Sequence, residues 1–97
     1  MKKHTIKDIE EYLTDIGLED AGVILFKNPD YADAFIGMSQ DDRAIYDYNK
    51  MVECLVHDDG MDEGEAAEFI DYNTVNAHVD NGPIILMPVL EDLWNAD

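Results

Sequence analysis

The sequence predicts an α+β fold, in which a small antiparallel β-sheet of three to four strands, with a hairpin at its centre, packs against three α-helices. Three observations predict this class. Apolar residues recur every three or four positions behind good helix N-caps, short apolar runs rich in strand formers are bounded by turn residues, and a polar turn joins the two best strand candidates. With 97 residues, 46% of them hydrophobic, residues 1–97 are expected to form a single domain with its own core.

The first helix is expected to begin after Thr5, which is a favourable N-cap residue. Asp8 follows three positions later as the acidic member of a capping box. Gly17 is placed to end the helix, because glycine readily adopts the left-handed conformation found just after a helix C-terminus. One apolar stripe is formed by Ile6, Ile9, Leu13 and Ile16.

The strand candidates are short. The run GVILF (22–26) is predicted to be a strand, with a continuation of the first helix as the alternative. Residues 32–39 and 43–48 flank the polar turn QDD and form the best hairpin candidate. The later run GPIILMPV is predicted to be a strand at a sheet edge or a strand end, because Pro83 and Pro88 bound it and proline cannot donate to a β-ladder.

The second helix is expected to open near Tyr48 and to end at Gly60, with one apolar side made of Met51, Val52, Leu55 and Val56. The third helix is expected to begin after Asp62, with Asp62 as N-cap and Glu65 as its reciprocal acid. Several carboxylates of this region therefore have a structural role, since acids near a helix N-terminus interact favourably with the helix dipole.

The third helix has two contrasting faces. The inner face is predicted to contain Ala66, Phe69, Ile70, Asn73 and Ala77, and the opposite face Glu68, Asp71, Tyr72 and Val75. An amide on a buried face must find hydrogen-bond partners. Asn73 is therefore interpreted as a clamp on the backbone of a neighbouring turn, with a contact to a partner as the alternative.

The net charge of −17 is the most unusual property of the sequence, which has 23 acids and 6 bases. Three of the bases fall within the first seven residues, and from Met51 onward there are twelve acids and no Lys or Arg. Three explanations compete: a solubilising surface, a docking face for a basic protein surface, and adaptation to high salt. Adaptation to high salt is disfavoured because the few bases are mostly Lys. Direct binding of nucleic acid is not expected, since it draws on basic residues.

No catalytic, cofactor-binding or metal site is predicted. Cys54 is the only cysteine, which precludes an intramolecular disulfide and favours a cytoplasmic location. Cys54 and His57, with His4 and His78 elsewhere, provide only one closely spaced pair, whereas a structural zinc site requires four ligands. The first residues have no apolar signal region, and no apolar run is long enough to span a membrane, so no membrane association is expected.

Residues 44–74, AIYDYNKMVECLVHDDGMDEGEAAEFIDYNT, followed by PIIL (83–86), resemble a family of small acidic bacterial proteins of unknown function that also occur on phages and mobile elements. The shared pattern is Y-D-Y-x-K-M, then D-G-M, E-A-x-E-F-I-x-Y-N-T and P-I-I. The resemblance implies no activity. Where that family tends to continue with an Arg and a Leu-Pro-Tyr segment, this chain has VNAHVDNG, which makes it more acidic still.

These observations support two classes of function. In the first, the protein is a non-enzymatic inhibitor that mimics nucleic acid and occupies the basic groove of a nucleic-acid-binding enzyme, as phage-encoded anti-CRISPR and other anti-defence proteins do. In the second, it is a housekeeping interaction module, with a homodimer through an open sheet edge as one form and with its charge serving solubility. The partner-binding residues predicted for the first class are Asp58, Asp59, Glu65, Glu68, Asp71 and Tyr72.

Overall fold

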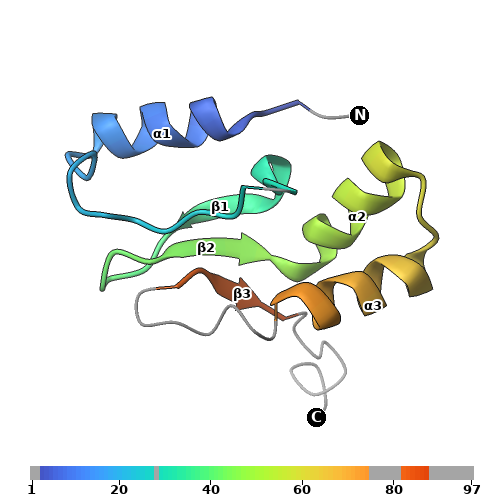
Figure 1. Ribbon diagram of the computed structural model, residues 1–97. Helices are drawn as coiled ribbons and strands as arrows, with labels where there is room; N and C mark the ends of the chain where they lie inside the picture. The colour runs from blue at the N-terminus through green and yellow to red at the C-terminus, as the bar shows by residue number, and fades with distance from the viewer. Residues whose placement is uncertain (1–2, 28, 75–81, 88–97) are drawn as a thin grey trace, which may run out of the picture.

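The computed structural model describes residues 3–27, 29–74 and 82–87 and has an α+β fold (Figure 1). Its elements are α1 (Ile6–Asp15), the short 3₁₀ helix η1 (Ala32–Ala34), β1 (Phe35–Met38), β2 (Ala44–Asp47), α2 (Tyr48–Asp59), α3 (Glu63–Thr74) and β3 (Ile84–Leu86). In Figure 1, α1 lies along the β1 side of the sheet, and α2 and α3 gather beyond the end of β2. The predicted fold class and the central hairpin are therefore confirmed.

The three described strands lie in the order β1-β2-β3, and the sheet is mixed. β1 and β2 are antiparallel, with an irregular register between Phe35 and Gly37, whereas β2 and β3 are parallel, with Ile45 opposite Ile84. The prediction of a purely antiparallel sheet is thus wrong for β3. The reason is topological: α2 and α3 lie between β2 and β3, and a long helical crossover allows the chain to return in the same direction. The predicted edge position of this strand is confirmed within the described sheet, while Pro88 lies outside the described residues.

The hairpin turn closes as predicted, but the strand before it begins late. The Ser39 N–H donates to the Arg43 carbonyl at 2.8 Å, and the Arg43 N–H donates to Ser39 Oγ at 2.9 Å. Ala32–Ala34, predicted to be part of the strand, form η1 instead. Tyr31 directly before them adopts a left-handed conformation, with φ of 49°, which breaks the extended backbone.

The run at 22–26 is neither a strand nor a continuation of α1, so both predictions for it are wrong. Val23, Leu25 and Phe26 pack against the core, which accounts for their apolar character. The Phe26 N–H donates to the hydroxyl of Tyr46 at 3.3 Å. The Tyr46 side chain therefore provides the hydrogen-bond acceptor that the backbone of a neighbouring strand would provide in a β-ladder.

The predicted boundaries of α1 and α2 are confirmed. At the start of α1, the Thr5 N–H donates to the Asp8 carboxylate at 2.8 Å. The glycines that follow α1 and α2 both have left-handed backbone conformations, with φ of 80° at Gly17 and 72° at Gly60. The sequence analysis did not identify the N-cap of α2, which is Asp47: its carboxylate accepts from the Lys50 N–H at 2.9 Å.

Among the residues that the structure describes, the hydrophobic core consists of two clusters, which share partly buried neighbours such as Phe35 and Met38. Its largest fully buried side chains come from β2, α2 and α3 and are Tyr46, Met51, Leu55 and Ile70. α1 contributes Ile9 and Leu13, which pack with Ala32 and Phe35. Ile16, predicted to continue the apolar stripe of α1, is 45% exposed because the helix has already ended. None of the helices that the structure describes combines the length and apolarity needed to cross a bilayer.

Candidate functional site

The outward face of α3 is the site that the sequence analysis favoured, and the predicted N-cap of this helix, Asp62, is confirmed. The Glu65 N–H donates to the Asp62 carboxylate at 2.7 Å. This hydrogen bond is the main cause of a lowered pKa at Asp62. The carboxylate at the positive end of the helix dipole is therefore stabilised in its charged form.

Burial fixes which face of α3 is available to a partner. Ala66 and Ile70 are 0% and 1% exposed and point into the core. On the opposite side Glu68 and Asp71 are exposed, and Tyr72 is 82% exposed. An aromatic ring that is this exposed contributes little to folding but offers a large contact area to a partner.

The charge of this face is not compensated by the rest of the described chain. Neither Glu68 nor Asp71 forms an ion pair or a hydrogen bond with another described side chain. The guanidinium of Arg43 donates instead to the Gly82 carbonyl at 2.7 Å, where it holds the start of β3 beside β2. Lys50 lies on α2, where it lines a separate hollow. Glu68 and Asp71 are therefore exposed without neutralisation by any described residue.

A shallow hollow of about 420 Å³ lies beside these acids. It is lined by Met61, Glu65, Glu68, Phe69, Tyr72 and Asn73. Apolar or aromatic side chains thus lie beside two carboxylates along one side of α3. Such a surface suits a partner that presents basic groups around an apolar or aromatic residue.

The structure divides the six predicted partner-binding residues into separate groups. Glu65, Glu68 and Tyr72 line the hollow on α3, and Asp71 is exposed on the same helix without lining that hollow. The remaining two, Asp58 and Asp59, line a different hollow, where the C-terminal end of α2 faces residues 29–33. No single hollow in the described part of the chain therefore contains all six residues.

The interpretation of Asn73 as a buried clamp is wrong. Asn73 is exposed, and its side-chain amide donates to the Phe69 carbonyl within α3 at 2.8 Å. This bond, from residue i to i−4, caps a carbonyl of its own helix rather than a neighbouring turn. Ala77 and Val75, predicted for the two faces of this helix, lie outside the described residues.

The polar residues considered as metal ligands do not form a metal site in the part of the chain that the structure describes. His4, Cys54 and His57 line one hollow of about 380 Å³, together with Lys3, Lys50 and three carboxylates. No three His, Cys, Asp or Glu side chains among residues 3–27, 29–74 and 82–87 are placed to hold a metal ion. His78 is outside these ranges.

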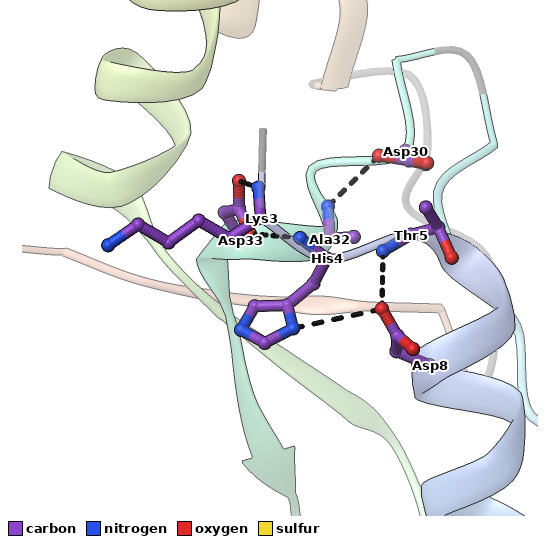
Figure 2. A network of polar contacts seen from close by, with 7 residues as sticks. All are labelled: Lys3, His4, Thr5, Asp8, Asp30, Ala32 and Asp33. Carbon is purple, nitrogen blue, oxygen red and sulfur yellow. Dashed lines mark hydrogen bonds and ion pairs between the residues drawn. The ribbon is translucent and has the colours of Figure 1, made fainter. Parts of the chain in front are cut away.

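A polar network that the sequence did not reveal holds the N-terminal segment in place (Figure 2). The Asp33 carboxylate accepts from the Lys3 N–H at 2.8 Å and from the His4 N–H at 2.7 Å. Asp30 accepts from the Ala32 N–H at 3.0 Å and so shapes the turn that presents Asp33. The partners are about thirty positions apart in sequence, and no local pattern signals such a contact.

No family model matches the chain, and neither the curated proteins nor the solved structures include a match. The residues and geometry of the chain itself are therefore the basis for inferring its function.

Proposed function

We propose that this protein is a small, non-enzymatic, cytoplasmic binding protein whose α3 face docks on a basic surface of a partner protein. The observation that carries the proposal is the pair of uncompensated carboxylates, Glu68 and Asp71, beside the exposed ring of Tyr72. Like charges on one helix face repel each other and destabilise the free protein. A basic partner would relieve this repulsion, and the free energy released would stabilise the complex.

The apolar part of the same face would add contact area. Phe69 is half-buried, and together with Met61 and Tyr72 it lines the hollow on α3. Interfaces combine aromatic anchors at their centre with charged groups at the rim, and the charges contribute mainly to specificity and to the association rate. In this proposal Tyr72 is the anchor, and the carboxylates orient the partner.

The partner surface that fits best is the groove of a nucleic-acid-binding enzyme. Glu65, Glu68 and Asp71 follow at intervals of three residues, and positions at this interval on a helix are about 5 to 6 Å apart between Cβ atoms. This is comparable to the distance between successive phosphates on a nucleic-acid strand. The protein would then inhibit by mimicry, as an anti-CRISPR or another anti-defence protein does.

The test compares two variants that lose the same charge from different helices. The first neutralises α3 through Glu68→Gln and Asp71→Asn, and the matched control neutralises α1 through Glu10→Gln and Glu11→Gln, which are also exposed. Each variant and the parent protein is immobilised, exposed to bacterial lysate at low salt, and the retained proteins are quantified by mass spectrometry.

The proposal predicts that one or a few basic proteins are retained by the parent and by the α1 variant but not by the α3 variant. Equal loss from both variants would mean that retention depends on net charge alone. If the parent protein and both variants retain the same proteins equally, α3 is not part of the interface.

A homodimer through the sheet edge is the second candidate, because β1 pairs with β2 alone among the described strands and its Ile36 is 46% exposed. A free strand edge with an apolar residue can pair with a second copy. Light scattering coupled to size exclusion tests this directly. A dimer that Ile36→Lys converts to a monomer would support the candidate, and a monomeric parent protein would exclude it.

A further inference from the structure

A second hollow, of about 330 Å³, lies where residues 29–33 face the C-terminal half of α2. Four of its lining residues are aspartates and one is a lysine: Asp30, Asp33, Asp58, Asp59 and Lys27. This lining is therefore strongly negative. The hollow shares no residue with the one on α3, so a ligand bound here is independent of the function proposed for that helix.

One of the side chains that line this hollow is Tyr31, which is only 3% exposed. Its hydroxyl is buried and has no hydrogen-bond partner among residues 3–27, 29–74 and 82–87. Buried polar groups are satisfied in the great majority of cases, so an unpartnered hydroxyl beside a hollow indicates a position for a ligand. The backbone of Tyr31 is left-handed, with φ of 49°.

The surroundings of the phenol favour a positively charged ligand. Burial, with smaller electrostatic contributions from Cys54 and Asp59, raises the pKa of Tyr31 to about 12. The phenol is therefore neutral at physiological pH, and its oxygen can accept a hydrogen bond. Both oxygens of Asp33 already accept from backbone N–H groups of the N-terminal segment (Figure 2). Asp59, by contrast, is exposed and makes no hydrogen bond or ion pair to another described residue.

The shape and lining of the hollow select an organic cation. Among the described residues no three acidic, histidine or cysteine side chains are arranged for a metal ion. The wall also includes Pro29, Ala32 and Leu55, which are apolar. An alkyl chain could lie along these residues while its charged end reaches the carboxylates, as lysine side chains do at protein surfaces.

We propose that this hollow binds a primary alkylammonium group, whose nitrogen donates to the Tyr31 hydroxyl and is neutralised by Asp59. The methylene chain of the ligand packs on the apolar wall. Two sources supply this chemistry: a free diamine or polyamine, and a lysine side chain of another protein.

The experiment is an NMR titration of the ¹⁵N-labelled protein at constant ionic strength. The probes are 1,5-diaminopentane for a free amine, Nα-acetyl-lysine amide for a lysine residue, and 1-pentanol as the uncharged control. Both amines are expected to give saturable shifts at the backbone amides of Tyr31, Ala32, Leu55 and Asp59, whereas pentanol gives none. The amine that binds more tightly identifies the source.

Variants separate this site from general attraction to an acidic protein. Tyr31→Phe is expected to weaken amine binding about tenfold, because hydrogen bonds that involve a charged group are among the stronger ones. Asp59→Asn should also weaken binding, and because Asp59 is exposed this variant does not depend on the core remaining intact. Tyr12→Phe, which changes an exposed tyrosine on α1, is the matched control and should bind like the parent.

Two results would overturn the proposal. One is a set of amide shifts that is as large along α3 as around Tyr31, since this would indicate unspecific attraction of cations. The other is an affinity that neither Tyr31→Phe nor Asp59→Asn changes.

Discussion

Two buried tyrosines allow the contribution of a single hydroxyl group to the free energy of unfolding to be measured within one core. Tyr31 and Tyr46 belong to the same hydrophobic cluster and are 3% and 0% exposed. Phe26 packs against both rings, with centroid distances of 5.5 and 4.8 Å. The two hydroxyls differ in one respect: that of Tyr46 accepts from the Phe26 N–H, whereas that of Tyr31 has no partner in the described part of the chain. Replacing each tyrosine by phenylalanine removes the same atom from a similar setting.

We expect the two substitutions to change the free energy of unfolding by different amounts. The bond at Tyr46 is 3.3 Å long, which is longer than the usual N–H···O distance, and the Phe26 donor is only half-buried. Tyr46→Phe should therefore lower the free energy of unfolding by about 1 kcal/mol. For a domain of this size that corresponds to a melting temperature lower by about 4 to 8 °C. Tyr31→Phe breaks no hydrogen bond, so it should leave the free energy of unfolding unchanged or raise it by up to about 1 kcal/mol.

Urea unfolding followed by circular dichroism measures both values, and equal slopes would show that the midpoints can be compared. Destabilisation by Tyr31→Phe that is as large as that by Tyr46→Phe would refute the expected difference. That result would mean that the hydroxyl of Tyr31 has a partner in the folded protein.

Three further predictions concern helix capping and charge. Asp62→Ala should lower the free energy of unfolding by about 0.5 to 2 kcal/mol, because it removes the N-cap of α3, and an unchanged urea midpoint would contradict this role. Alkaline pH should destabilise the fold: burial raises the pKa of Tyr31 and Tyr46 to about 12 from the ordinary value of 10.0, so their contribution is complete below about pH 10 and is lost as the pH rises toward 12. This contribution is at most about 3 kcal/mol for each tyrosine, and a free energy of unfolding that does not fall between about pH 10 and about pH 12 would exclude it. The free protein should melt at a higher temperature in about 0.5 M NaCl than in about 20 mM, because salt screens the repulsion among its carboxylates, and a lower melting temperature in high salt would contradict this account.

The features that sequence reasoning predicted well are those that depend on near neighbours. The N-caps at Thr5 and Asp62, the left-handed glycines at Gly17 and Gly60, and the turn before Arg43 each involve residues at most five positions apart. Capping and turn formation use side chains and backbone groups of the same segment. Local sequence therefore contains the information that fixes them.

The features that it missed depend on contacts between distant segments. Residues 23–26 are apolar because they cover the core, and apolar character alone does not distinguish a covering loop from a strand. The direction of β3 is set by the path of the chain through α2 and α3, not by its own residues. Asn73 was placed on the inner face by its helical spacing, but the buried part of α3 that the structure describes centres on Ala66 and Ile70.

The candidate site was predicted in part for the same reason. Helical spacing brought Glu65, Glu68 and Tyr72 together correctly, because all three lie on one helix. The position of Asp59 against Tyr31 could not be predicted, since it requires α2 to pack on a segment almost thirty residues earlier. The unpartnered hydroxyl has no signature in the sequence at all.

Competition with nucleic acid is the measurement that tests the central proposal most directly. The basic protein retained by the parent chain is purified, and its affinity for the parent is measured in the absence and presence of saturating duplex DNA or RNA. If the α3 face occupies a nucleic-acid groove, duplex should displace the protein, and the protein should in turn inhibit nucleic-acid binding by its partner, while the Glu68→Gln, Asp71→Asn variant should do neither. A partner that binds the protein and the duplex at the same time, each with undiminished affinity, would contradict mimicry.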